Sequence, residues 1–362
     1  MNKVGFGFLR LPKKGEELDY EQINEMVDLF LSRGGSYFDT CYTYLNGDSE
    51  KGLKKCLVDR YPRERFRIAN KLPGYRCKTY EDCRTYFDEG LRRCGVSYFD
   101  VYMLHWLNQK HYDIAEQVDE FRFLREVKAS GEAREIGFSY HDSASLLDRI
   151  LTDHPEVDVV QIQLNYLDWD SAGIEAGKCY DVCVKHGKKV CVMEPVKGGT
   201  LSTLPAEAER LLREMHPDWS NASWALRFVQ SLEQVGICLS GMSTPDQVRE
   251  NMADVSPLGE AERERLRAVC DIITAQTAVP CTGCRYCETH CPRKIAIPDY
   301  FRMYNELSRH PRDEWKIKPV YEQLIRQHGK ASDCIACRSC EAHCPQKIEI
   351  SAFMKKAAEA LG

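Results

Sequence analysis

Short runs of hydrophobic residues alternate with longer amphipathic stretches over roughly the first 280 residues. The runs are rich in β-branched and aromatic side chains, and most are nearly continuous in hydrophobic residues, as expected for strands buried on both faces. We predict eight strands, at Gly5–Leu11, Tyr37–Cys41, Phe66–Lys71, Phe99–His105, Glu135–Ser139, Val157–Leu164, Lys189–Glu194 and Ile237–Gly241.

The stretches between these runs place hydrophobic residues three and four positions apart, which predicts amphipathic helices. Helices are expected at Tyr20–Ser32, Thr79–Cys94, Glu116–Ala129, Ser220–Leu232, Pro245–Met252 and Gly259–Thr277. Strands and helices that alternate in this way indicate a parallel (β/α)8 barrel, also called a TIM barrel. A doubly wound open sheet is the alternative, but no G-x-G-x-x-G motif follows an early strand.

Composition and charge exclude several classes of protein. Hydrophobic residues make up 43% and charged residues 29% of the chain, which is ordinary for a globular protein. A formal net charge of −5 gives no indication that the chain binds nucleic acid or an anionic membrane. No hydrophobic run is long enough to cross a bilayer, and the N-terminal segment lacks a signal core. We therefore expect a cytoplasmic protein.

Cysteine is the unusual component, with 18 residues. Eight of them form two identical C-x2-C-x2-C-x3-C-P arrays, which begin at Cys281 and Cys334. Disulfides are rare in a reducing compartment, so this regularity indicates metal ligation. The spacing is that of bacterial ferredoxins, in which the fourth cysteine of each array ligates the other cluster.

The arrays therefore predict two [4Fe–4S] clusters in an α-helical ferredoxin-like domain. One set of ligands would be Cys281, Cys284, Cys287 and Cys344, and the other would be Cys334, Cys337, Cys340 and Cys291. Zinc is the alternative, but zinc sites take their ligands in pairs rather than in two equal runs of four. We expect a helical insert over roughly Pro298–Gln327, and domains at residues 1–278 and 279–362.

Four polar residues stand at or just after the carboxyl ends of predicted strands, namely Asp39, Tyr44, Lys71 and His105. Active sites of (β/α)8 barrels lie on that face. This set is the tetrad of the aldo/keto reductases, and the chain resembles that family over residues 1–275 in GFGFLRLP, FDTCYTY, GFSYH, the segment Gln161–Asn165 and STPDQVREN. Together with the two arrays, it resembles the iron–sulfur branch of the superfamily.

The resemblance implies hydride transfer between a nicotinamide and a carbonyl or alcohol substrate. Tyr44 would donate a proton to the carbonyl oxygen, because a nearby Lys71 cation favours the phenolate. Asp39 would hold Lys71, and His105 would orient the oxygen or relay the proton. Tyr42 is an alternative tyrosine in the same loop, although the five-residue spacing favours Tyr44.

The nucleotide contacts that the resemblance implies are Ser139, Asn165, Glu194, Ser240, Gly241, Gln247 and Asn251. Many family members grip a 2′-phosphate with a basic pair at the positions that Gly241 and Gln247 occupy here. The choice between NADPH and NADH therefore stays open, with Arg249 or Lys197 as substitutes for the missing charge. Cys41 is interpreted as a packing residue, because the sequence implies no histidine partner for it.

Two further hypotheses concern the electron path. A nicotinamide moves two electrons as a hydride and a cluster moves one, so a bound flavin such as FMN would reconcile them in a flavin-linked reductase fed by the clusters. Alternatively, the barrel binds nucleotide without turnover and the chain is an electron-transfer subunit. We expect a redox protein partner for the clusters. The aromatic residues Tyr75, Trp106, Tyr166 and Trp169 suggest an apolar or aromatic substrate pocket, although a sugar also stacks on such rings.

Overall fold

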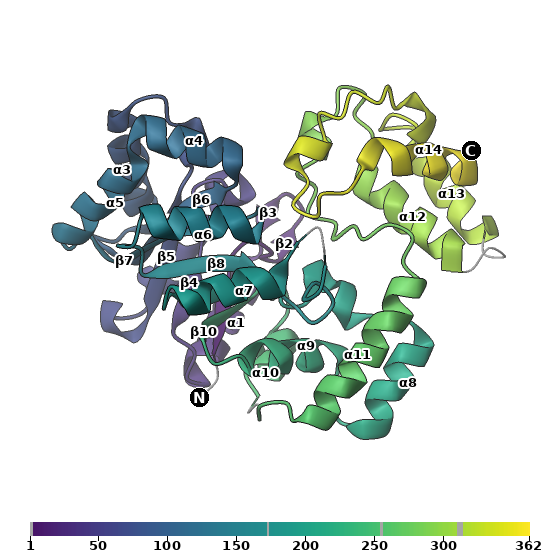
Figure 1. Ribbon diagram of the computed structural model, residues 1–362, viewed down its shortest axis with the longest axis horizontal. Coiled ribbons are helices and arrows are strands. Elements are labelled where there is room, and N and C mark those ends of the chain that lie inside the picture. The colour runs from purple at the N-terminus through teal and green to yellow at the C-terminus, as the bar shows by residue number, and fades with distance from the viewer. Residues whose placement is uncertain (1–2, 172–173, 254–255, 310–313) are drawn as a thin grey trace. The chain divides into compact units, whose positions relative to one another are not determined.

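The computed structural model describes residues 3–171, 174–253, 256–309 and 314–362 (Figure 1). The chain forms two compact units, the first made of Met1–Pro195 with Ala222–Leu258 and the second of Val196–Asn221 with Gly259–Gly362. The domain boundary at residue 278 stays a prediction from the sequence. Among the described residues, no helix is long and hydrophobic enough to span a bilayer.

The first unit contains a closed barrel of eight parallel strands. They are β1 (Val4–Gly7), β4 (Tyr37–Asp39), β5 (Arg67–Leu72), β6 (Phe99–Leu107), β7 (Ala133–Tyr140), β8 (Val159–Gln163), β9 (Lys189–Met193) and β10 (Val235–Ser240). Around the barrel the order is β1-β10-β9-β8-β7-β6-β5-β4, so each strand lies beside its sequence neighbour in the barrel and β1 closes on β10. The eight predicted strands are confirmed, and the open-sheet alternative is wrong.

Side chains alternate between the barrel interior and its outer face because the strand period is two. Tyr37, Ala69 and Met103 lie in the buried interior cluster. Two residues farther along, β4, β5 and β6 reach Asp39, Lys71 and His105, which therefore face the same interior at its carboxyl end. The register pairs Asp39 with Ala69 and Lys71 with Met103, so the carboxyl ends of β4, β5 and β6 are staggered by about two residues from one strand to the next.

Helices follow the strands, and α2, α6 and α7 among them were not in the predicted ranges. They are α1 (Tyr20–Ser32), α2 (Asp48–Leu53), α3 (Tyr80–Cys94), α4 (Gln109–Val118), α5 (Glu120–Ala129), α6 (Ala144–Asp153), α7 (Ala176–Lys185), α9 (Asn221–Gln230) and α10 (Pro245–Asn251). The single helix expected at Glu116–Ala129 is wrong, because Asp119 has a left-handed backbone (φ 64°) that separates α4 from α5. A short hairpin, β2 (Lys13–Lys14) with β3 (Glu17–Leu18), was not predicted.

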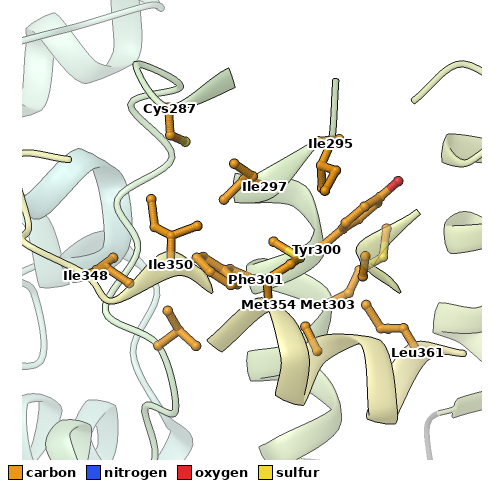
Figure 2. Close-up of a cluster of buried hydrophobic side chains, with 14 of the residues drawn as sticks. Cys287, Ile295, Ile297, Tyr300, Phe301, Met303, Ile348, Ile350, Met354 and Leu361 are labelled. Atoms are coloured by element: carbon orange, nitrogen blue, oxygen red, sulfur yellow. The ribbon is translucent and has the colours of Figure 1, made fainter. Parts of the chain in front are cut away.

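The second unit is helical, with α8 (Ala206–Met215), α11 (Glu260–Ala275), α12 (Ile297–Arg309), α13 (Glu314–Leu324) and α14 (Ile350–Leu361). The helical insert predicted between the arrays corresponds to α12 and α13, and residues 310–313 of it lie outside the described residues. Figure 2 shows the buried core of this unit, where Tyr300 and Phe301 of α12 lie near Met354 of α14. Cys287 and Cys340 belong to the same core, so the cysteine arrays fold onto the helices.

Glu120 is a buried acid at the start of α5. The residue is only 2% exposed, and its Oε1 atom makes no hydrogen bond to the described residues. Burial raises the pKa of this carboxyl to about 8, because water no longer solvates the charge. Glu120 is therefore protonated in the folded protein at neutral pH.

We expect Glu120→Gln to stabilise the protein at pH 9 by a few kcal/mol, and to change its stability little at pH 4, on the order of ~0.5 kcal/mol. An unfolded glutamic acid loses its proton near pH ~4.3, whereas folded Glu120 keeps it to about pH 8, so the wild type loses stability as pH rises through this window. Urea denaturation at both pH values measures the effect. Glu132→Gln is the control: hydrogen bonding from Arg84 lowers the pKa of Glu132, so no gain at pH 9 is expected. An equal gain at both pH values for Glu120→Gln would contradict the assignment.

Candidate active site and cluster-binding loops

A buried ion pair lies at the carboxyl end of the barrel. Lys71 Nζ is 2.6 Å from Asp39 Oδ2 and donates a second hydrogen bond, of 3.0 Å, to the backbone oxygen of Thr40. The two side chains are 0% and 3% exposed. Burial raises the pKa of the Asp39 carboxyl, and the adjacent Lys71 ammonium opposes that rise. The pair therefore holds a cation at a fixed position inside the barrel mouth.

Tyr44 and His105 lie next to this cation. Lys71 Nζ is 5.0 Å from the centroid of the Tyr44 ring, and the rings of Tyr44 and His105 meet edge to face with centroids 5.9 Å apart. Tyr44 begins a short 3-10 turn after β4 and is half-buried. The structure thus brings together the four residues of the predicted tetrad, which come from the ends of β4, β5 and β6.

His105 has a partner that the sequence did not indicate. Its Nδ1 atom is 3.3 Å from Cys41 Sγ, so the expectation that Cys41 has no histidine partner is wrong, although Cys41 is fully buried as a packing residue would be. Burial raises the pKa of the Cys41 thiol to about 11, so this group is not a thiolate at neutral pH. Burial, with Lys71 as the next cause, holds the pKa of His105 well below its usual range. A neutral His105 with Nδ1 engaged leaves Nε2 as the ring nitrogen for a ligand.

Aromatic side chains surround His105. The Tyr75 ring centroid lies 6.0 Å from that of His105, 5.8 Å from that of Trp106 and 5.1 Å from that of His111. The predicted aromatic character of this region therefore includes His111, which occupies the first turn of α4. Sequence periodicity could not distinguish His111 from an ordinary polar residue on a helix.

Two other aromatic residues expected at the pocket contact a helix of the barrel unit. The rings of Tyr166 and Trp169 lie 6.2 Å and 5.6 Å from Phe228 of α9, measured between centroids. These contacts account for packing by both rings, and their place in a substrate pocket stays a prediction.

Three residues predicted to contact the nicotinamide follow or end successive strands. Ser139 Oγ accepts a 2.7 Å hydrogen bond from the backbone N–H of Trp106. Asn165 Nδ2 donates to the backbone oxygen of Glu194 at 3.1 Å and to Asp168 Oδ2 at 2.8 Å. Asn165 thus braces the loops after β8 and β9, and it lies beside the Glu194 backbone.

The second predicted group of nucleotide contacts belongs to the segment after β10. Asn251 Nδ2 donates to Ser240 Oγ at 3.0 Å, which joins the end of α10 to the end of β10. Gln247 Oε1 accepts from the backbone N–H of Ser243 at 2.7 Å. Gly241 lies between these contacts, and a Cβ atom there would be 3.1 Å from the Arg10 side chain.

The two substitute cations named from the sequence are both engaged. Arg249 forms ion pairs with Asp246 at 2.5 Å and with Glu25 at 3.2 Å. Lys197 belongs to the second unit, where its Nζ donates to Gln346 Oε1 at 2.9 Å. Both cations therefore already have partners within the chain, and a role for either at a 2′-phosphate stays a prediction.

The predicted cluster ligands line two cavities in the second unit. The lining of the first cavity, whose space of about 310 Å³ is partly open to solvent, includes Cys281, Cys284, Cys287 and Cys344. The lining of the second, with about 350 Å³ that is also partly open, includes Cys291, Cys334, Cys337 and Cys340. Ile297 and Ile350 contribute to both cavities. Four thiols around a largely apolar cavity fit an iron–sulfur cluster, and each fourth cysteine crosses to the other array's cavity.

A closed parallel barrel with polar residues gathered at its carboxyl end is typical of enzymes built on the (β/α)8 fold. Residues 3–270 match the model of the aldo/keto reductase family, and residues 280–349 match that of the 4Fe-4S dicluster domain. The chain therefore belongs to the aldo/keto reductase family and is an oxidoreductase. The dicluster domain follows the reductase domain in the sequence.

Curated relatives agree with the family. The chain is 25% identical over 286 residues to the NADH-specific methylglyoxal reductase of Escherichia coli, an alignment that covers 66% of this chain and 85% of the relative. It is 24% identical over 237 residues to an aldo-keto reductase of Mycobacterium avium, covering 65% and 77%.

Solved structures show the same barrel. The holo form of an aldo-keto reductase from Bacillus halodurans superimposes with a TM-score of 0.61 at 23% identity, covering 74% of this chain and 91% of that one. A Klebsiella pneumoniae aldo/keto reductase in complex with NADP and acetate gives a TM-score of 0.61 at 20% identity, covering 74% and 90%.

Proposed function

We propose that the barrel catalyses nicotinamide-dependent interconversion of a carbonyl and an alcohol, and that the dicluster domain exchanges electrons with a redox protein. The observation that carries the first part is the buried Asp39–Lys71 pair beside the Tyr44 ring and His105. An ammonium fixed in this way next to a phenol favours proton transfer from that phenol.

Each residue of the tetrad has a role in this reaction. A bound nicotinamide supplies the hydride. Tyr44 donates its hydroxyl proton to the oxygen that becomes negative, and Lys71 stabilises the phenolate that remains. Asp39 keeps Lys71 charged and in place. Neutral His105 presents Nε2 to the substrate oxygen, since Cys41 engages Nδ1.

The nucleotide would lie across the ends of β7 to β10. Ser139, Asn165 and Glu194 would contact its carboxamide, and the segment from Ser240 to Asn251 would hold the remainder. The E. coli relative is named as NADH-specific, whereas the Klebsiella structure contains NADP. In this chain Gly241 and Gln247 carry no charge, which favours NADH, although the Arg10 side chain lies against Gly241.

The two cavities would hold [4Fe–4S] clusters, with the first cavity's ligands Cys281, Cys284, Cys287 and Cys344 and the second cavity's ligands Cys291, Cys334, Cys337 and Cys340. These groups supply one-electron transfer. Thiolate ligands of this kind suit a reducing compartment, so we place the protein in the cytoplasm. A flavin gains no support from the matched families or from the solved structures named above.

The test is an anaerobic titration of the cluster-containing protein with NADH and, separately, with NADPH. We expect one nucleotide, NADH in the first instance, to bind saturably and to be oxidised when a panel of aldehydes and ketones is added. Saturable binding without turnover of any carbonyl would overturn the proposal in favour of an electron-transfer subunit.

Cluster absorbance and EPR spectra recorded during the same titration report on the second half of the proposal. Loss of cluster absorbance on addition of the nucleotide would show that electrons pass from the nucleotide bound in the barrel to the clusters. Clusters that only dithionite reduces would instead serve a separate donor, and the barrel would act as a simple reductase.

A further inference from the structure

The two cavities are built on the same cysteine spacing but differ in how exposed their lining residues are. The residue after the first cysteine of each array is Thr282 in the first cavity, which is 6% exposed, and Ile335 in the second, which is 60% exposed. Among the described residues, the exposed ones that line the second cavity are His290, Pro292, Arg293, Ile335, Cys337 and Arg338, whereas Arg285 is the exposed one that lines the first. The rim of the second cavity is therefore accessible to a partner.

The residue after each Cys-Pro pair shows the same difference. In the first cavity this residue is Gln346, which is buried and accepts a hydrogen bond from the buried Nζ of Lys197. In the second cavity it is Arg293, which is exposed. The first cavity is thus closed by contacts within the unit at the position where the second presents a cation.

Charge separates the two cavities as well. Arg285 of the first array is neutralised by Glu288 at 2.7 Å and by Asp299 at 2.9 Å. Arg338, at the equivalent position of the second array, reaches Glu341 only at 4.0 Å. The described residues that line the second cavity include Arg293 and Arg338 and no acid. The second cavity therefore has a cationic rim around an exposed hydrophobic residue.

We propose that the rim formed by Arg293, Ile335 and Arg338 is the docking face for an acidic electron-carrier protein. The inference rests on the proposed function, in which the clusters pass electrons. Arginine and exposed hydrophobic side chains are typical of the centres of protein interfaces, and electron-transfer encounters bury small areas steered by complementary charge. A cluster held by Cys291, Cys334, Cys337 and Cys340 would accept one electron from the reduced carrier, so the carrier would be oxidised by one electron, the cluster would be reduced by one, and no bond would form or break.

The experiment uses the cluster-containing full chain and an acidic plant-type [2Fe–2S] ferredoxin as the probe. Anaerobic stopped-flow absorbance gives the rate of electron transfer from the reduced ferredoxin, and calorimetry gives the Kd of the oxidised one. We expect both rate and affinity to fall as salt is raised, because salt screens the charges that steer the encounter. The double variant Arg293→Glu/Arg338→Glu should lower both by tenfold or more.

The matched control reverses two exposed charges that do not line either cavity, Arg302→Glu/Lys318→Glu, and should leave rate and affinity within about twofold of wild type. Iron content and reduction by dithionite establish that each variant holds its clusters. If the glutamate variant loses iron, Arg293→Gln/Arg338→Gln and the salt dependence of the wild type carry the test.

Three results would overturn the docking face. They are a wild-type rate that does not change with salt, an arginine variant that matches the control, and a homodimer in sedimentation that Ile335→Asp dissociates, since the rim would then be covered by a second copy. Carbonyl turnover with NADH is measured on the same samples without ferredoxin. Absence of carbonyl turnover would contradict the proposed function. Normal turnover, together with a ferredoxin rate and affinity that do not depend on salt, would contradict the docking face alone.

Discussion

Tyr44→Phe is expected to lower the turnover of carbonyl reduction by about 10³-fold while leaving both clusters in place. The phenylalanine ring keeps the space beside Lys71 Nζ, 5.0 Å away, and beside His105. It lacks the hydroxyl group that would give its proton to the substrate oxygen, so hydride transfer would leave an unprotonated alkoxide. Because Tyr44 is half-buried, we expect the fold and the affinity for nucleotide to change little.

The measurement is the anaerobic rate of NADH or NADPH oxidation at saturating carbonyl, with nucleotide binding and iron content determined on the same samples. Tyr42→Phe is the matched control. The Tyr42 hydroxyl donates to Glu89 of α3 at 2.8 Å, and its ring packs on Tyr86, so its loss should leave turnover within about threefold of wild type. Turnover of Tyr44→Phe within tenfold of wild type would remove Tyr44 from the proposed mechanism.

Lys71→Met is expected to destabilise the barrel by about 3–5 kcal/mol and to abolish carbonyl reduction. The substitution leaves the Asp39 carboxylate buried without its counter-charge, with only 3% of its side chain exposed. Burial already raises the pKa of Asp39, and the loss of Lys71 removes the group that opposes this rise. Asp39 should then protonate, so the variant should recover part of its stability as pH falls.

Urea denaturation followed by tryptophan fluorescence measures the loss. The double variant Lys71→Met/Asp39→Leu should regain much of the stability, since no buried charge is left unpaired, but it should remain inactive. Lys51→Met is the control, because its pair with Asp48 is exposed and such pairs contribute about 0–1 kcal/mol. A Lys71→Met protein as stable as wild type would show that the Asp39–Lys71 pair is not buried as described.

Local patterns explain why so much of the architecture was predictable. Strand and helix periods are set within a few turns of chain, so all eight strands and helices such as α1 appear in the sequence at or near their observed bounds. Cysteine spacing is equally local, and it indicated the grouping of thiols that line the two cavities. Asp39, Lys71 and His105 were predictable because strand ends converge at one face of a barrel.

Contacts between distant segments decided the rest. The sequence could not indicate that Cys41 lies against Nδ1 of His105, 64 positions later, or that Tyr166 and Trp169 pack on Phe228. It also could not distinguish Thr282 from Ile335, since both follow the first cysteine of the same motif.

The sequence alone thus determined the barrel and the two cysteine arrays, because each depends on residue type at short or regular spacing, and it indicated the tetrad through the predicted strand ends and the resemblance to the aldo/keto reductases. The tertiary structure alone decided the partner of His105, the burial of the Asp39–Lys71 pair and the exposure of one cavity rim but not the other. Burial and ion pairing depend on which distant side chains meet, and this is a property of the folded chain rather than of any one segment.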